Sequence, residues 1–204
     1  MNTKTVSKLA LALLAALSLN AMAEDNPWMV RVRATNLNWD NGQTAAVQSL
    51  NVNAKDKTIP EFDVSYFFTK NIAAELVLTY PQKVSIDATS GNIGSVKALP
   101  PTLLAQYHFD DIGPIKPYIG AGVNYTIFSS RNNLAAGVYS TESRSFGLAG
   151  QVGADYMLNK NWGINVDVKY IKINTDVIVN SSNAHAGNLN LSPIATSVGV
   201  TYKF

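Results

Sequence analysis

The sequence alternates most regularly in the stretch Trp162-Gly163-Ile164-Asn165-Val166-Asp167-Val168-Lys169-Tyr170. Every second side chain there is large and apolar or aromatic, and the residues between them are polar or glycine. Successive side chains of a β-strand point to opposite faces, so this period of two predicts a strand with one apolar and one polar face. The aromatic residues at its two ends suit the headgroup level of a membrane barrel.

The same period of two recurs along the chain from Pro27 onward. In the first segment Trp28 and Val30 share a face, and Arg31 and Arg33 share the other. Such runs, separated by turn-like or polar links, predict about eight strands. The alternating segments are 28–35, 61–69, 75–80, 102–109, 118–127, 146–156, 162–170 and 194–204.

The first residues of the chain form a segment of another kind. Lys4 and Lys8 precede an apolar run from Leu9 to Leu19, which is followed by Ala21-Met22-Ala23. A charged start, a short apolar run and a small-x-small site are the layout of a secretory signal peptide. A transmembrane helix is the alternative, but this run has only roughly half the ~20 residues that a helix needs to span a bilayer. We therefore expect cleavage after residue 23 and a mature protein of residues 24–204.

Composition excludes several kinds of function. The sixteen Lys and Arg residues exceed the fourteen Asp and Glu residues by the two lysines of the leader, so the expected mature chain is neutral and gives no sign of a nucleic-acid partner. There is no cysteine, which excludes disulfides and Cys-ligated metals. Histidine pairs and carboxylate clusters with ligand spacing are also missing from the sequence, so we expect no metal and no cofactor.

The links between the segments decide which β-fold is expected. Three short links alternate strictly with four long, polar links: 70–71, 110–114 and 158–161 are short, and 37–58, 81–97, 129–143 and 174–191 are long. A soluble sandwich also has alternating strands, but it has no reason to keep this order of links. The sequence therefore predicts an all-β fold, an eight-stranded antiparallel transmembrane β-barrel with short periplasmic turns and long external loops. Closing the sheet pairs every backbone group inside the lipid.

Aromatic residues mark the ends of many segments, as in the interfacial girdles of membrane barrels. The residues expected in these girdles are Trp28, Tyr80, Phe109, Tyr118, Trp162, Tyr170 and Phe204.

Three stretches of the chain resemble the outer-membrane protein W family, which includes an alkane-uptake protein. They are Leu99-Pro100-Pro101-Thr102-Leu103-Leu104-Ala105-Gln106-Tyr107 with Pro117-Tyr118-Ile119-Gly120-Ala121-Gly122-Val123-Asn124-Tyr125-Thr126, then Gly150-Gln151-Val152-Gly153-Ala154-Asp155-Tyr156 leading to Asn161-Trp162, and Asn71-Ile72-Ala73-Ala74-Glu75-Leu76 with Pro81. The resemblance covers nearly all of the expected mature chain. It implies a narrow, partly apolar channel in the outer-membrane lipid for the passive passage of small, hydrophobic solutes. Small amino acids are also proposed as solutes for some members.

The C-terminal strand carries a further part of the resemblance. Phe204, with Tyr202 before it, resembles the signal that the barrel-assembly machinery reads, which makes that machinery an expected partner. An aromatic residue at a strand end also completes a girdle, so Phe204 has a purely structural interpretation as well.

Charged residues occupy the expected inward faces, which is unusual for an interior that side chains can just fill. One interpretation is an ion-pair network that fills the lumen and satisfies itself. The other is a charge-lined transport path. The inward charged residues are Arg31, Arg33, Glu61, Asp63, Glu75, Asp155, Asp167, Lys169 and Lys203.

The resemblance also implies a channel constriction at Val77 and Lys169. Val77 is apolar on an inward face, whereas relatives tend to carry tryptophan in the strand context of Lys169. We therefore expect Lys169 to pair with Glu75 or Asp167 and to make the constriction more polar.

A hydrophobic solute need not travel the whole lumen. It can enter through the external loops and leave sideways into the bilayer. Pro100-Pro101 would interrupt strand pairing at one possible exit, although a plain strand start explains them equally well.

Two other functions compete with transport. Catalysis needs a base and a nucleophile in contact, but His108 and His185 are expected at opposite ends of the barrel, so we expect no enzyme. A filled barrel that acts as an adhesin or surface receptor through its external loops is the alternative function, because a fold alone does not imply transport.

Overall fold

The computed structural model describes residues 26–43, 51, 53–88, 91–109, 113–130 and 134–204. The expected leader, residues 1–23, lies outside the described residues, and its cleavage stays a prediction. In the part of the chain that the structure describes, no helix is long and apolar enough to cross a membrane.

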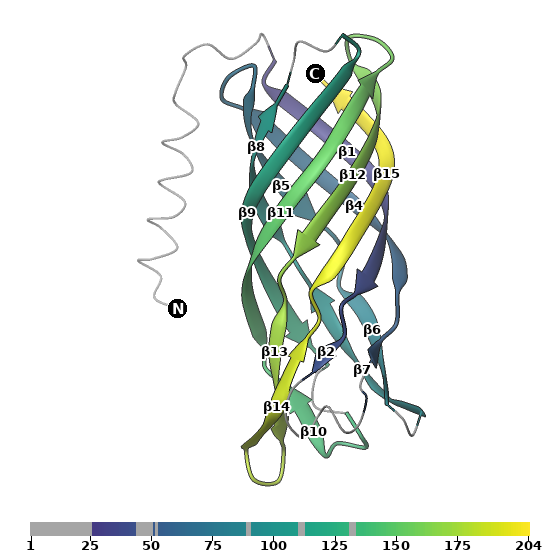
Figure 1. Ribbon diagram of the computed structural model, residues 1–204, viewed down its shortest axis with the longest axis vertical. Helices are drawn as coiled ribbons and strands as arrows, with labels where there is room; N and C mark the ends of the chain where they lie inside the picture. Colours follow the sequence, from purple (N-terminus) through teal and green to yellow (C-terminus); the bar gives the residue numbers. More distant parts are fainter. Residues whose placement is uncertain (1–25, 44–50, 52, 89–90, 110–112, 131–133) are drawn as a thin grey trace.

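Eight long strands form the wall of a barrel (Figure 1). Each pairs with its neighbours in antiparallel register, and the pairing of the fifth wall strand with the sixth closes the ring. This arrangement confirms the predicted eight-stranded antiparallel barrel. The wall strands are β1 (Trp28–Trp39), β4 (Lys57–Phe67), β5 (Ile72–Leu78), β8 (Thr102–His108), β9 (Ile115–Ser129), β11 (Arg144–Met157), β12 (Trp162–Ile171) and β15 (Pro193–Lys203).

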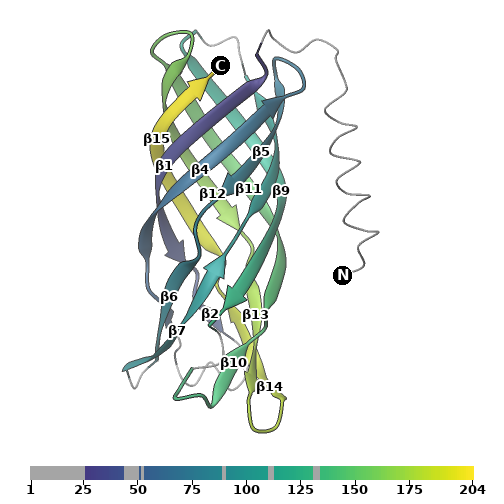
Figure 2. The same cartoon turned by 180° about the vertical axis from the view of Figure 1, so that it is seen from behind.

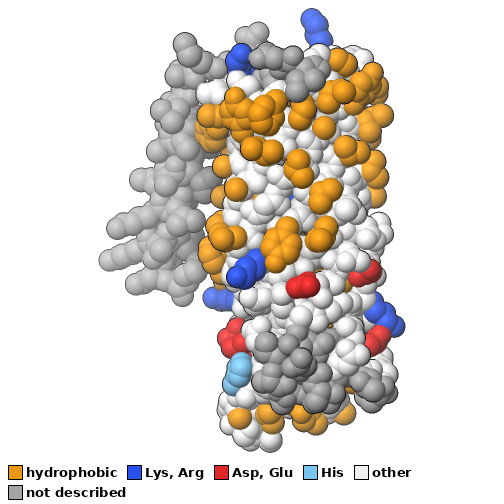
Figure 3. Space-filling view, viewed as in Figure 1, with side chains coloured by type: hydrophobic (Ala, Val, Ile, Leu, Met, Phe, Trp, Pro, Cys, Tyr) orange, Lys and Arg blue, Asp and Glu red, His pale blue; other side chains and the backbone are white. Residues whose placement is uncertain are grey.

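The two faces of the wall follow the predicted alternation. In β12 Ile164 and Val166 are 46% and 54% exposed, whereas Asn165 and Asp167 between them are buried in the interior. Apolar side chains cover the outside of the barrel as a broad band, and charged side chains appear at its lower edge in Figure 3. This surface suits contact with lipid tails.

One end of the barrel, here called the turn end, carries tight connections and the C-terminus (Figure 1). Between β4 and β5 the Thr69 hydroxyl accepts hydrogen bonds from the backbone N–H groups of Asn71 and Ile72, at 3.3 and 3.0 Å. Between β11 and β12 the Asn159 side chain does the same for Asn161 and Trp162, at 2.9 and 2.8 Å. Side-chain oxygens thus replace the strand partners that a tight turn removes.

The opposite end, here called the loop end, is built from the long links, and these contain further strands. They include a β6–β7 hairpin and a small sheet of β10, β13, β14 and β2. Each of these strands has few buried side chains on its inward face, such as Val84 and Ile86 in β6. The sequence alone therefore did not distinguish them from polar loops. The added strands are β2 (Gly42–Gln43), β3 (Asn53–Ala54), β6 (Gln82–Ala88), β7 (Gly91–Leu99), β10 (Tyr139–Thr141), β13 (Asn174–Val179) and β14 (Ala184–Asn190).

Aromatic side chains ring the turn end on the outside. Trp162 and Phe204 both pack edge-on against Tyr202, with ring centroids 4.8 Å apart in each case. The girdle prediction was wrong for Tyr118, which is fully buried. Tyr118 belongs to the inward row of β9, and the alternation of that strand outweighs its place near a strand end.

Glycines allow backbones to come close together inside the narrow barrel, as two positions show. A Cβ at Gly122 would collide with the Leu103 carbonyl of β8, and a Cβ at Gly147 would collide with the Lys172 carbonyl. Backbone atoms cannot rotate away as a flexible side chain can. These positions therefore require glycine, in agreement with the close backbone approach that strand glycines often mark.

Candidate functional site

Charged side chains from five wall strands meet in the middle of the barrel. Each has no more than 4% of its side chain exposed. They occupy inward positions of β1, β4, β5, β11 and β12, as the alternation predicts. We call them the charged layer: Arg31, Arg33, Lys169, Glu61, Asp63, Glu75, Asp155 and Asp167. The layer holds three cations and five acids, so acids outnumber bases.

Arg31 joins opposite sides of this layer. Its Nη1 contacts Glu75 Oε2 at 2.5 Å, and its Nε and Nη2 bind the two oxygens of Asp155 at 3.1 and 2.6 Å. Such a two-point arginine–carboxylate pair fixes both side chains. β1 is thereby connected to β5 and to β11 across the lumen.

Arg33 is the most heavily engaged residue of the layer. Its guanidinium lies 3.0 Å from Glu61 and 2.5 Å from Asp63. It also lies 3.4 Å from Glu75 and 3.5 Å from Asp167. The contact with Asp63 is an ion pair without the angles of a hydrogen bond, and Asp63 Oδ1 has no hydrogen-bond partner among the described residues. One arginine therefore compensates four buried carboxylates.

Lys169 completes the layer from β12. Its Nζ donates to Glu61 Oε1 at 2.8 Å and to Asp167 Oδ1 at 2.7 Å. The sequence led us to expect that Lys169 pairs with Glu75 or Asp167. The structure shows Asp167 as one partner of Lys169, and the other partner is Glu61 and not Glu75. The contact with Glu61 crosses the lumen from β12 to β4, so the layer extends from wall to wall.

Several neutral side chains bind the charged layer, and sequence reasoning did not assign them to it. The Tyr118 hydroxyl donates to Asp167 Oδ2 at 3.1 Å and accepts from Asn165 Nδ2 at 3.0 Å. Gln151 donates to Glu75 Oε1 at 2.9 Å and accepts from Gln106 at 2.9 Å. The only signal for them was their place on inward rows, because neutral polar residues fit equally well on any polar face.

On the loop-end side of the charged layer the interior becomes apolar. Buried residues there form one hydrophobic cluster that includes Val77, Leu104, Ile171 and Ile173. Val77 lies opposite Asp63 in the ladder between β4 and β5, so it stands at the border of the two regions. The expected constriction pair is thus divided, with Val77 in the apolar cluster and Lys169 in the charged layer.

The barrel wall is interrupted next to this apolar region. The ladder between β4 and β5 ends at the pair Phe62 and Leu78, and it resumes between β3 and β6 at Ala54 and Ile86. Across the described residues 56–61 and 79–84, no ladder pair joins the two sides. Figure 2 shows this side of the barrel, with β4 and β5 above β6 and β7. We call this interruption the wall break.

Both sides of the wall break depart from strict alternation. Ala54 and Ile59 are both buried although they are an odd number of residues apart. Val77 and Gln82, on the other side, are likewise both buried at an odd spacing. A strand cannot do this without a local bulge, because its side chains alternate between faces. Pro60 lies on one side, and Pro81 on the other. Proline supplies no N–H to a ladder, which favours separation of the strands at this point.

The pair Pro100-Pro101 suggested an exit beside β8, but the wall break lies where the pairing of β4 with β5 ends. Pro100 and Pro101 directly precede β8, as a strand start would require. The Pro101 carbonyl accepts a hydrogen bond from Tyr125 N at 3.1 Å, so this segment stays attached to β9.

The remaining expected positions lie away from the lumen centre. Lys203 lies at the turn end, and Tyr202 and Phe204 lie on the outside of β15, where Phe204 N donates to the Trp28 carbonyl at 3.1 Å. His108 packs between the rings of Phe67 and Tyr118 at the turn end.

The second histidine belongs to the loop-end sheet. His185 Nε2 lies 3.2 Å from Asp176 Oδ1. Hydrogen bonds from Asn188 and His185 hold the pKa of Asp176 below its usual value. Among the described residues, no group of three or more His, Asp or Glu side chains is arranged to hold a metal ion.

Comparison with known proteins supports the architecture. The OmpW family model matches residues 26–204. The chain belongs to the OmpW family.

Several known outer-membrane proteins are similar to this chain along most of their length. Outer membrane protein W of Salmonella typhimurium is 34% identical over 206 residues, 96% of this chain and 97% of the relative. An uncharacterized outer-membrane protein, y4mB of Sinorhizobium fredii, is 40% identical over 184 residues, 88% of this chain and 80% of the relative. The crystal structure of OprG from Pseudomonas aeruginosa superposes with a TM-score of 0.74 at 26% identity, covering 90% of this chain and 98% of OprG. The protein is therefore a bacterial outer-membrane barrel.

Proposed function

We propose that this OmpW-family protein lets small apolar solutes cross the outer membrane passively. The solute enters the barrel at the loop end and leaves sideways through the wall break into the bilayer. The observation that carries this proposal is the position of the wall break, which lies beside the apolar interior and meets the charged layer only at its edge, at Glu61.

The charged layer makes the axial route unfavourable for an apolar solute. Passage down the lumen would separate ion pairs that connect β1 with β5 and β11, and β12 with β4. Separating buried partners leaves uncompensated charge, at a cost of about 3–5 kcal/mol for a single pair. A sideways exit avoids this cost and delivers an apolar molecule to lipid tails, where it is stable.

The wall break can be tested by crosslinking it. The chain has no cysteine, so a double variant Pro60→Cys/Tyr80→Cys has one possible disulfide. Both residues are exposed, and the shared register of β3–β6 and β4–β5, continued across the wall break, would pair them. We expect the oxidised protein to admit an apolar solute about tenfold more slowly, as a rise of about 1.4 kcal/mol in the barrier gives. Reduction should restore the rate.

A matched control uses a pair within the intact ladder. Val64 and Leu76 lie opposite each other in β4 and β5, so the crosslink Val64→Cys/Leu76→Cys fastens a wall that is already closed. Uptake through this variant should not depend on oxidation. Unchanged uptake through the oxidised Pro60→Cys/Tyr80→Cys barrel would refute sideways exit.

Lys169 is proposed to set the solute preference near the constriction, together with Val77. Its ammonium offers a partner to the carboxylate of a small zwitterion, and tryptophan would offer apolar surface instead. We expect Lys169→Trp to shift the ratio of apolar to zwitterionic uptake about tenfold toward the apolar solute, which corresponds to about 1.4 kcal/mol.

The measurement compares two solutes of similar size in cells with an intact outer membrane. Lys172→Trp, at an exposed position of the same region, is the control for the added ring. Unchanged solute preference and conductance in Lys169→Trp would show that Lys169 has no part in selection.

A filled barrel that acts as an adhesin or receptor is the second candidate. The wall-to-wall charged layer favours it, because such a layer rigidifies a barrel whether or not anything passes. Equal uptake of both solutes with and without the protein would support this candidate. In either case we propose that Phe204 and Tyr202 serve recognition by the barrel-assembly machinery, since they lie at the end of the C-terminal strand.

A further inference from the structure

The outer face of the β6–β7 hairpin carries two lysines directly opposite each other. Lys83 of β6 and Lys97 of β7 are partners in the antiparallel ladder, and both are exposed. The next ladder pair, Val84 and Val96, is buried on the other face of the hairpin. Directly opposed residues have Cβ atoms about 4.5–5.5 Å apart, and like charges at such positions destabilise a sheet. The fold therefore holds two positive charges close together on its outer surface.

Neither lysine of this pair forms an ion pair with a described acid. Asp87, which belongs to the same hairpin, lies 2.9 Å from Lys55 instead. Glu142 of the link before β11 is exposed and, in the part of the chain that the structure describes, makes no ion pair with Lys83 or Lys97. The described chain thus supplies no counter-charge to the two lysines.

The polar row continues from the hairpin onto β9. Lys97 is the ladder partner of Ser129, which is exposed as well. An ammonium group only donates hydrogen bonds, and a hydroxyl can donate one. Three neighbouring strands, which lie about 4.7–4.9 Å apart, therefore present donors in one row. An anion with several acceptor oxygens matches this row. A phosphate monoester has three such oxygens and a charge of about −1.5 to −2 at pH 7.

The outer face becomes apolar on the turn-end side of this row. Two residues farther along each strand, Leu99 of β7 is the ladder partner of Ile127 of β9. Ile127 is 41% exposed, and Tyr125, the next outward residue of β9, is exposed too. On the face drawn in Figure 3, charged side chains likewise begin where the apolar band ends. The lysine row thus lies at the edge of the lipid-facing band, at the level of the headgroups.

We propose that Lys83, Lys97 and Ser129 bind the phosphate monoester of a lipid in the outer leaflet. The acyl chains of this lipid lie along Leu99 and Ile127. The long loops of the barrel are external, which places the row in the outer leaflet. The phosphate charge offsets the two lysines, and their repulsion becomes a shared attraction. A free anion would use the lysine row alone, whereas a lipid uses both the row and the apolar surface beside it. The site faces the bilayer, so the inference is independent of the proposed uptake of apolar solutes.

The test uses the full-length barrel in detergent micelles, with phosphatidic acid as the probe and native mass spectrometry to count the bound lipid. Phosphatidylcholine has the same acyl chains, but choline covers its phosphate. Glycerol phosphate is the headgroup without acyl chains. We expect phosphatidic acid to bind about tenfold more tightly than either comparison probe, a difference of about 1.4 kcal/mol. Binding of glycerol phosphate as tight as that of phosphatidic acid would overturn the assignment to a lipid.

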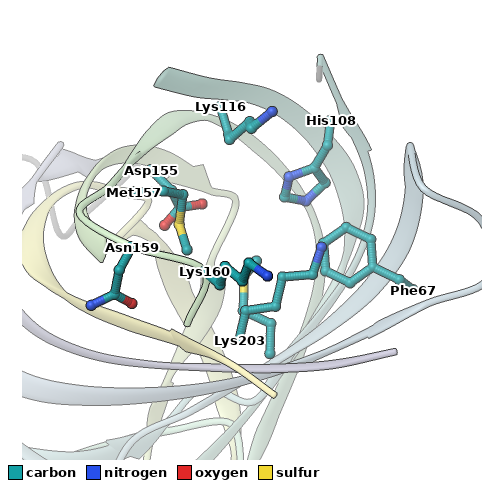
Figure 4. Close-up of a pocket in the computed structure, with 9 residues that line it drawn as sticks. Phe67, His108, Lys116, Asp155, Met157, Asn159, Lys160 and Lys203 are labelled. Atoms are coloured by element: carbon teal, nitrogen blue, oxygen red, sulfur yellow. The ribbon is translucent and has the colours of Figure 1, made fainter. Parts of the chain in front are cut away.

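The variant Lys83→Gln/Lys97→Gln should weaken the binding of phosphatidic acid about tenfold, which again corresponds to about 1.4 kcal/mol. The matched control is Lys70→Gln/Lys160→Gln, which removes the same charge from two exposed lysines at the turn end. Figure 4 shows Lys160 there, on the turn between β11 and β12. Unchanged binding in Lys83→Gln/Lys97→Gln, or an equal loss in the control, would overturn the proposal.

Stability provides a second measurement, because the effect of one lysine should change sign with the lipid. In phosphatidylcholine vesicles Lys97→Gln relieves the repulsion from Lys83, so the urea midpoint of unfolding should rise. In vesicles that contain phosphatidic acid the same variant loses a phosphate partner, so the midpoint should fall. A shift of the same sign in both kinds of vesicle would contradict a lipid phosphate site at this pair.

Discussion

Replacing Arg33 with methionine is expected to lower the free energy of unfolding by about 3–5 kcal/mol, the usual cost of removing one partner from a buried ion pair. Methionine fills similar space, so the loss is electrostatic and not a cavity effect. Among the described residues Asp63 would lose its one ion-pair partner, and Glu61 and Glu75 would each keep one other cation. The charged layer already has more acids than bases, which makes the loss of a cation especially unfavourable.

The measurement is urea unfolding of the barrel in lipid vesicles, followed by tryptophan fluorescence. Arg144→Met makes the same chemical change at an exposed position of β11 and should alter stability by less than about 0.5 kcal/mol. Asp63→Asn removes an acid from the layer with little change in shape and should cost less than Arg33→Met. Equal costs for Arg33→Met and Asp63→Asn would contradict the role assigned to charge balance.

Replacing Gly122 with alanine is expected to destabilise the barrel by about 3 kcal/mol, at the upper end of the usual cost of overpacking. The new Cβ would collide with the Leu103 carbonyl of β8, so the β8–β9 ladder would have to separate locally. A single methyl group would thus disturb backbone pairing inside the membrane, where water cannot replace lost hydrogen bonds.

The same substitution nearby gives the control. A Cβ at Gly150 in β11 would have no heavy atom within 4 Å outside its own chain neighbours, so Gly150→Ala should be close to neutral. Urea unfolding in vesicles again provides the comparison. A similar loss of stability in both variants would show that general strand propensity, and not close approach, explains the need for glycine at Gly122.

Alternation in the sequence predicted the barrel correctly, because the barrel depends only on which face a residue occupies. The inward rows that it indicated contain the eight residues of the charged layer, but they also included Lys203, which lies at the turn end. The strand that contains Asp167 and Lys169 is an example, since its inward row is evident from the sequence. The pairing inside the layer was not predictable to the same degree. Lys169 meets Glu61 across the lumen, and that contact depends on how far each side chain reaches in a closed ring.

Other features could not be predicted from the sequence, each for an identifiable reason. Tyr118 was placed in a girdle because an aromatic residue near a strand end has two possible faces. The wall break was not located because it depends on the register between strands that no local pattern specifies, although Pro60 and Pro81 mark it afterwards.

The register on the two sides of the wall break determines how the two unpaired segments can pair with each other. From Ala54 to Phe62 and from Leu78 to Ile86 the chain advances by the same number of residues, so neither side carries an extra one. The two segments can therefore pair residue by residue, without sliding along each other and without moving the hairpins beyond them. Under the proposed sideways exit, an opening at this place would leave the rest of the ring unsheared and would interrupt the permeability barrier of the membrane only there.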